Sequence, residues 1–295
     1  MKLWGIDLGG TKIECAVLDA GKTIARRRLP TEAEQGYEHI IGQITRLIAE
    51  VSGEIGERPA KIGFATPGTL DPDSQLLKNS NTVIMNGKPL RTDLENVLQI
   101  PVKIANDANC FALAESLLGA GKEFPNAEVI FGVIMGTGVG GGLVVHGRVI
   151  EGIHGIGGEW GHNILEENGE LCFCGKNGCV EQVISGTALQ NYYAKISNRK
   201  LNLEEIVKNH RAGNDKYASE TVERFLEFYG RAIATLINVL DPHLIVIGGG
   251  VGNIDLLYTE GFEFVKKYVF NPIVRTAIRP PLLGDSAGVF GAALL

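Results

Sequence analysis

Several features are missing from the 295-residue sequence, and each absence argues against a class of protein. No run of about 18 apolar residues exists, so we predict no membrane-spanning helix. Lys and Arg (28) are fewer than Asp and Glu (34), and the net charge of −6 provides no overall basic field to attract nucleic acid or anionic lipid. The first ten residues contain no signal-peptide apolar region. We therefore expect a cytoplasmic protein that acts on small molecules, without nucleic-acid or membrane partners.

Cysteine is also scarce, with five residues. Because the number is odd and three of the cysteines lie within eight residues, a disulfide framework is not expected. His162, Cys172, Cys174 and Cys179 lie within eighteen residues of sequence. Four nitrogen and sulfur ligands are typical of tetrahedral Zn²⁺, and a site filled by four protein ligands is structural. The alternative is that three half-buried thiols lie close together by coincidence.

Glycine, in contrast, is abundant, with 39 residues against 11 prolines. Residues 3–8 and 13–18 are two apolar runs joined by a glycine turn, which predicts a β-hairpin. Such a turn can present consecutive backbone N–H groups to an anion. An ordinary hairpin turn is the alternative. The residues predicted to bind a nucleotide phosphate here are Asp7, Gly9, Gly10, Thr11 and Lys12.

The hairpin pattern occurs twice, because residues 4–11 align without gaps on residues 131–138. A repeat of this length predicts two homologous α/β lobes with a ligand cleft between them. Periodicity predicts helices over residues 37–51 and 221–240. We place the N-terminal lobe at residues 1–120, with a returning C-terminal helix at 286–295, and the C-terminal lobe at residues 121–285.

The second glycine segment, residues 136–141, also fits the G-x-G-x-x-G pattern of dinucleotide-binding oxidoreductases. That pattern must open a helix, whereas residues 142–148 read as a strand turning back. The chain also contains no G-x-x-x-x-G-K-[ST] sequence. Gly136, Thr137 and Gly138 are therefore predicted to form a second phosphate loop that binds the same polyphosphate.

These motifs together resemble the ROK family of bacterial repressors and kinases, over essentially the whole chain. The resemblance is carried by segments 7–12, 67–68, 105–110, 136–142, 158–162, 172–181 and 248–250. It implies a two-lobed, actin-like (ribonuclease H-like) ATPase fold with duplicated α/β domains. It also implies an ATP-dependent sugar kinase, with ATP and Mg²⁺ as cofactors, and a homodimer.

The resemblance further assigns roles to single residues. Asp107 would be the general base that accepts the proton of a sugar hydroxyl, although an aspartate at the end of a strand can also be a plain helix N-cap. Asp7 would contact Mg²⁺ through water. The residues expected to contact the sugar are Gly68, Asn106, Asp107, Glu159, His162 and Glu181. The residues expected under the adenosine are Gly248, Gly249 and Gly250.

Residues 78–82 and 86–90 look more like the fructokinase members of the family than the N-acetylglucosamine kinases. We therefore predict phosphorylation of fructose to fructose 6-phosphate. Glucose, mannose and N-acetylated hexosamines stay open, because one or two pocket contacts change discrimination by only about 1 to 3 kcal/mol. A non-catalytic sugar sensor would need a DNA-binding domain before Asp7, where we expect no room for one. An actin-like ATPase without a sugar substrate would have no use for Glu159 and Glu181.

Overall fold

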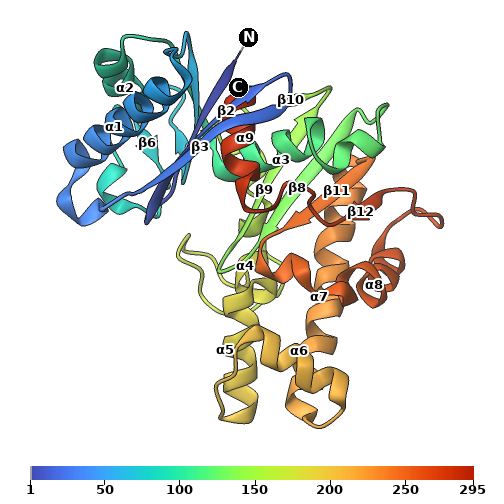
Figure 1. Ribbon diagram of the computed structural model, residues 1–295. Helices are drawn as coiled ribbons and strands as arrows, with labels where there is room; N and C mark the ends of the chain where they lie inside the picture. The colour runs from blue at the N-terminus through green and yellow to red at the C-terminus, as the bar shows by residue number, and fades with distance from the viewer. Residues whose placement is uncertain (1) are drawn as a thin grey trace. The chain divides into compact units, whose positions relative to one another are not determined.

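The computed structural model describes residues 2–295, which form two compact α/β units (Figure 1). The first unit contains residues 2–119, 147–157 and 283–295, and the second contains residues 120–146 and 158–282. Residues 147–157 therefore belong with the first unit, whereas the sequence placed them in the C-terminal lobe. Gly155 explains this difference, because its Cα lies so close to the backbone of Leu70 that a side chain would contact it.

The first unit is built on a five-stranded sheet in the order β3-β2-β1-β4-β7. The predicted hairpin is confirmed, because β1 and β2 pair antiparallel, and β3 pairs antiparallel with β2. The strands β4 and β7 extend the other edge in parallel. The bounds are β1 (Leu3–Leu8), β2 (Lys12–Asp19), β3 (Lys22–Pro30), β4 (Ile62–Thr66) and β7 (Val102–Asn106), with the short strands β5 (Thr69–Leu70), β6 (Leu77–Lys78) and β10 (Arg148–Val149) outside this sheet.

Helices cover both faces of this sheet (Figure 1). On one face lie α1 (Tyr37–Ile55) and α2 (Leu90–Leu98), and on the other lie α3 (Asp107–Leu117) and α9 (Ala287–Leu294). Alternate residues of β1, including Ile6, are buried in the same core as apolar residues of α1. Gly5 and Gly63 face α9, whose backbone lies where their side chains would be. The last helix therefore packs directly against the backbone of the central strands.

The second unit repeats this arrangement with the strand order β9-β8-β11-β12. The strands β8 and β9 form an antiparallel hairpin, and β11 and β12 continue the sheet in parallel. Their bounds are β8 (Val129–Met135), β9 (Val139–Val145), β11 (Leu244–Gly248) and β12 (Ala277–Arg279). Order and direction match β2-β1-β4-β7, so the short repeat seen in the sequence reflects a duplicated α/β scaffold.

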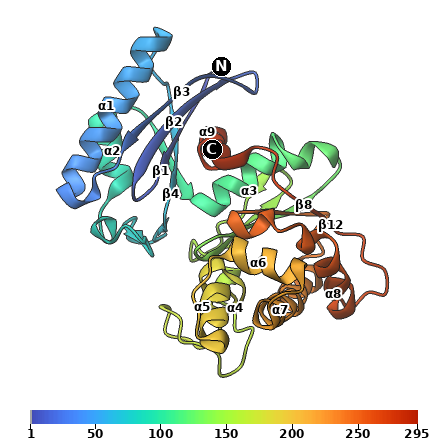
Figure 2. The ribbon, with the colours of Figure 1, turned by 60° about the horizontal axis from the view of Figure 1, so that its bottom comes forward.

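The helices of the second unit are α4 (Val180–Ile184), α5 (Gly186–Ser197), α6 (Leu203–Ala212), α7 (Lys216–Leu240) and α8 (Glu260–Tyr268). Figure 2 shows α4, α5, α6 and α7 gathered together. The buried face of α7, including Phe225 and Ile233, shares a core with strand residues such as Phe131 and Ile245. This helix begins five residues before the predicted start, because Asp215 caps it by accepting hydrogen bonds from the first turn.

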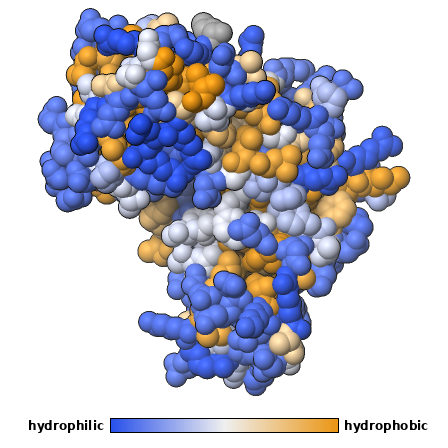
Figure 3. Space-filling model, viewed as in Figure 1, coloured by the Kyte–Doolittle hydropathy of each residue, from blue (hydrophilic) through white to orange (hydrophobic). Residues whose placement is uncertain are grey.

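Strongly hydrophilic residues gather over β3 in Figure 3. This strand carries Arg26, Arg27 and Arg28. Arg26 and Arg28 both donate to the carboxylate of Glu14, which is 1% exposed and comes from the neighbouring strand β2. The buried carboxylate is therefore paired on both sides. Among the helices of residues 2–295, none has the length and apolar composition needed to cross a bilayer.

Candidate functional site

The first glycine loop is the turn between β1 and β2. Gly9 N donates to Lys12 O across the turn at 3.0 Å. The buried Thr31 fixes the loop from behind, because its Oγ1 donates to Gly9 O at 2.6 Å. Gly10, Thr11 and Lys12 remain exposed. The turn therefore has a fixed base and an accessible tip, as a loop that binds phosphate requires.

Asp7 lies at the end of β1, just before this turn. Burial raises the pKa of its carboxyl group to about 6, and the negative charges of Asp107 and Glu14 contribute further. Lys12 and Arg28 oppose this shift. A half-buried carboxylate beside other carboxylates is stabilised by a nearby cation. This environment fits the predicted contact between Asp7 and a metal–nucleotide complex.

Asp107 is the first residue of α3, directly after β7. The N-cap of α3 is Asn106, whose Oδ1 accepts from Ala108 N at 2.9 Å, so capping does not by itself account for Asp107. Asp107 Oδ1 also accepts from Ala108 N, at 2.8 Å. The residue keeps solvent-accessible surface, yet desolvation by the protein around it raises the pKa of its carboxyl group, and the hydrogen bond from Ala108 opposes that shift. Asp107 is therefore an oriented carboxylate with increased proton affinity.

Gly68 lies next to Asn106, at the carboxyl end of β7. Asn106 Nδ2 lies 3.5 Å from Gly68 O, and Gly68 adopts a φ of 95°. The neighbouring segment 78–86 is fixed by Asn86, which exchanges two hydrogen bonds of 2.9 Å with the backbone of Ser80. Gly68, Asn106 and Asp107 thus lie at the carboxyl ends of the adjacent strands β4 and β7.

The second glycine loop joins β8 to β9. Gly136 N donates to Gly138 O at 2.9 Å, and Gly136 O accepts from Gly186 N at 2.7 Å. Val139 N donates to Glu181 Oε2 at 3.0 Å. The loop is therefore held from outside by the residues around α4, and Thr137 at its tip is exposed.

A third glycine segment lies beside the second. Gly248 ends β11, which pairs with β8, and Gly249 packs on the backbone of Met135 with a φ of 81°. The 3₁₀-turn that follows Gly249 is fixed by Tyr258, whose hydroxyl donates to Gly252 O at 2.8 Å. The second loop and residues 248–250 therefore form one glycine-rich edge of the second sheet.

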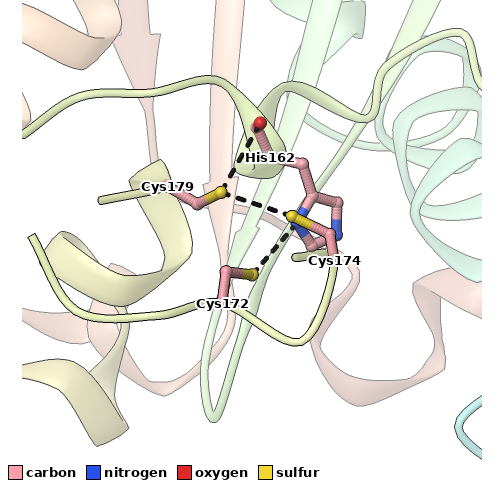
Figure 4. Close-up of side chains that lie close together, drawn as sticks. All are labelled: His162, Cys172, Cys174 and Cys179. Carbon is pink, nitrogen blue, oxygen red and sulfur yellow. Dashed lines mark hydrogen bonds between the residues drawn. The ribbon is translucent and has the colours of Figure 1, made fainter. Parts of the chain in front are cut away.

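The predicted metal ligands converge in the second unit (Figure 4). One ligand atom from each of His162, Cys172, Cys174 and Cys179 lies within 4.8 Å of all the others. Cys172 Sγ is 3.5 Å from His162 Nδ1, and the Sγ atoms of Cys174 and Cys179 are also 3.5 Å apart. Tetrahedral zinc would place two sulfur ligands about 3.8 Å apart and a sulfur and a nitrogen about 3.5 Å apart. The donor set and its spacing fit zinc.

The carboxylates predicted near this cluster lie on both sides of it in the chain. Glu159 precedes the 3₁₀-turn Trp160–His162, which is fixed by the bond from Trp160 Nε1 to Gly140 O at 3.1 Å. Glu181 lies in the first turn of α4, two residues after Cys179. Glu159, His162 and Glu181 therefore belong to the second unit, whereas Gly68, Asn106 and Asp107 belong to the first.

Sequence reasoning missed the residues that support these loops. Thr31 and Tyr258 fix two glycine segments through single hydroxyl groups, and Gly186 does so through its backbone N–H. No sequence motif marks them, because each acts across a tertiary contact.

Comparison with known proteins gives one consistent result. The ROK family model matches residues 3–295. An N-acetyl-D-glucosamine kinase of Pectobacterium carotovorum is 35% identical over an alignment of 302 positions, which spans 99% of this chain and 98% of that protein.

Two solved structures share the whole fold. A ROK hexokinase from Thermus thermophilus is similar with a TM-score of 0.90 and 35% identity, covering 100% of this chain and 97% of its own. A ROK family glucokinase from Streptomyces griseus, solved with glucose and AMPPNP, has a TM-score of 0.79 and 26% identity, covering 99% and 98%. These similarities confirm the predicted actin-like fold class.

Proposed function

Because the chain belongs to the ROK family, we propose that it transfers the γ-phosphoryl group of ATP to a hydroxyl of a hexose or an N-acetylated hexosamine. The observation that carries this proposal is the placement of Asp107 at the carboxyl end of β7, with a raised pKa and within the electrostatic influence of Asp7. The crystal structure of the related Streptomyces griseus glucokinase with AMPPNP supports ATP as the donor.

The reaction assigns a distinct task to each carboxylate. The acceptor hydroxyl oxygen forms the new bond to the γ-phosphorus, the bond to the bridging oxygen breaks, and ADP leaves with that electron pair. Asp107 takes the hydroxyl proton, and its hydrogen bond from Ala108 N keeps the carboxylate oriented. Asp7 contributes negative charge beside the first glycine loop, where magnesium would neutralise phosphate charge when the nucleotide is bound.

The two hairpin loops and residues 248–250 are assigned to the nucleotide. The N–H groups of Gly9 and Gly136 close the two turns, so the proposed donors to phosphate oxygens are the backbone N–H groups of Gly10, Thr11, Thr137 and Gly138, which are exposed or partly exposed. Gly249 packs on the backbone of Met135, and open space lies where a side chain of Gly250 would begin, which suits the adenosine. Lys12 is exposed at the first turn and is placed to contact a phosphate.

N-acetylglucosamine is the first acceptor to test, because N-acetyl-D-glucosamine kinases from Pectobacterium and Vibrio vulnificus are 35% and 37% identical to this chain. Fructose, predicted from residues 78–90, remains a candidate, as do glucose and mannose. In each case Gly68, Asn106, Glu159, His162 and Glu181 are the proposed contacts to the sugar, together with Asp107.

We also propose that the four-residue cluster holds a structural zinc ion. All four positions would be filled by protein, so the ion would order the loop rather than act on the substrate. His162 Nδ1 faces Cys172, which leaves its Nε2 for a sugar hydroxyl. A homodimer in the cytoplasm, with no nucleic-acid or membrane partner, completes the proposal.

The test is ADP release from magnesium-ATP with a panel of N-acetylglucosamine, fructose, glucose, mannose and N-acetylmannosamine. We expect one sugar to stimulate ADP release strongly and to be recovered as its phosphate ester. Equal ATP hydrolysis with and without every sugar would reject the kinase function. The rank order of the sugars decides between N-acetylglucosamine and fructose.

A further inference from the structure

We infer that Glu181 is a positioning residue for the nucleotide, because its carboxylate sets the shape of the second phosphate loop before any sugar binds. This inference rests on the proposed kinase function, in which residues 136–138 hold ATP phosphates. It assigns Glu181 a second task beside the proposed contact to the sugar.

The contacts of Glu181 are with the loop itself. Its Oε2 accepts from Val139 N at 3.0 Å, at the point where the loop enters β9. The same oxygen lies where a Cβ atom on Gly138 would be, so residue 138 can only be glycine while this carboxylate is in place. The carboxylate of Glu181 thus explains why residue 138 is a glycine.

A carboxylate at this place is electrostatically unfavourable for a loop that binds anions, since it repels phosphate. The hydrogen bond that Glu181 accepts from Val139 N offsets this repulsion, because it fixes the backbone at the end of the turn. A preorganised turn loses less conformational entropy when the nucleotide binds. The gain should therefore appear as nucleotide affinity.

Glu181 is also attached to the cysteine–histidine cluster. Cys179 is the N-cap residue of α4, and Val180 N donates to Asn163 O at 2.9 Å, next to His162. On the other side of α4, Gly186 N donates to Gly136 O at 2.7 Å. The short helix α4 is thus fixed at its start by the cluster segment and holds the phosphate loop through Glu181, and Gly186, the first residue of α5, holds the loop at a second point.

The experiment is calorimetric titration of magnesium-AMPPNP into the full-length protein in the absence of sugar. We expect Glu181→Ala to weaken AMPPNP binding about 10-fold, as the loss of one hydrogen bond to a charged group predicts. Glu181→Gln keeps an acceptor oxygen and should restore most of the affinity. Gln182→Ala, on the next residue of the same helix, should leave the affinity unchanged.

Gly138→Ala provides the second arm, because its methyl group would push the carboxylate away from Val139. We expect this change to weaken AMPPNP binding in the wild-type background and to have a much smaller effect in the Glu181→Ala background. Such non-additivity identifies a direct contact between the two positions. Circular dichroism and zinc content of each variant report whether the fold is intact.

Two outcomes would overturn the inference in different ways. If wild type binds AMPPNP and Glu181→Ala binds it equally well while sugar affinity falls, Glu181 is a contact to the sugar alone. If folded wild type binds no AMPPNP, the proposed function and this inference both fail. Additive effects of Gly138→Ala and Glu181→Ala would also reject the coupling.

Discussion

The two glycine loops stand on the same scaffold but obtain their charge and rigidity differently. Each joins the first two antiparallel strands of a sheet that then continues in parallel. The first loop carries its own charges, Asp7 and Lys12, and is fixed by the hydroxyl of Thr31. The second loop has no titratable residue between Gly136 and Gly138 and takes the carboxylate of Glu181 from outside the hairpin.

The two units share their strand order and differ in the residues that form and support their turns. The strands kept their order, because every strand depends on its neighbours for backbone hydrogen bonds. The turns were free to change, because their tips are exposed. The first unit carries two carboxylates with raised pKa values, Asp7 in β1 and Asp107 at the start of α3, whereas the second phosphate loop is held from outside by Glu181 and Gly186.

The largest effect is expected from removing the carboxylate of Asp107, the proposed general base, which belongs to the first unit. Asp107→Ala should reduce turnover by about 1,000-fold, within the range of general-base contributions, while AMPPNP and sugar still bind. Initial rates of ADP release at saturating substrates measure this loss. Asp73→Ala, an exposed carboxylate of the same unit, should be neutral. A variant that keeps a tenth of the rate would show that Asp107 is not the base.

The cluster that supports the second loop gives the next largest effect. Cys174→Ser should lower zinc content and reduce the Tm by about 5 °C, corresponding to a loss of roughly 3 kcal/mol in a protein of this size. Metal analysis and calorimetry measure the two quantities together. Cys15→Ala, in the first unit, should keep the zinc. A metal-free wild type with unchanged Tm would contradict the zinc assignment.

The raised pKa of Asp7 makes the first loop sensitive to pH. Its folded-state pKa of about 6 exceeds the ordinary value of 3.8 for an aspartate, so the folded protein binds more protons than the unfolded chain between these values. Stability should therefore fall as pH rises from about 4 to 6, and Asp7→Asn should recover about 3 kcal/mol at pH 7. Calorimetric Tm values across this range test it, with Asp19→Asn as the exposed control. Parallel pH profiles for wild type and Asp7→Asn would contradict it.

The smallest effect concerns the glycine segment beside the second loop. Tyr258→Phe removes the hydroxyl that donates to Gly252 O, a contribution of about 1 kcal/mol. We expect the KM for ATP to rise about 5-fold with little change in the KM for the sugar. Steady-state kinetics with each substrate varied in turn separate the two. A change confined to the sugar KM would contradict this role for the 248–252 segment.

The elements predictable from sequence were those with local signals. Apolar runs joined by a glycine turn located the first hairpin, the internal repeat located the second, and helical periodicity located α7. The cysteine spacing located a cluster that the fold brings together. The fold class came from motif resemblance. The start of α7 was misplaced, because the cap at Asp215 precedes the apolar pattern. The contacts of Thr31, Glu181 and Tyr258 were not predictable, since each links residues that are distant in sequence or depends on backbone geometry.

The packing of α9 against Gly5 and Gly63 has a consequence for how the chain is made. Synthesis delivers β1 first and residues 287–294 only after the whole second unit. Until then the central strands of the first sheet lack the helix that covers one of their faces. The second unit, whose strands and helices all lie between residues 120 and 282, can complete its core earlier. The first unit therefore lacks its last helix until the chain of the second unit has been made.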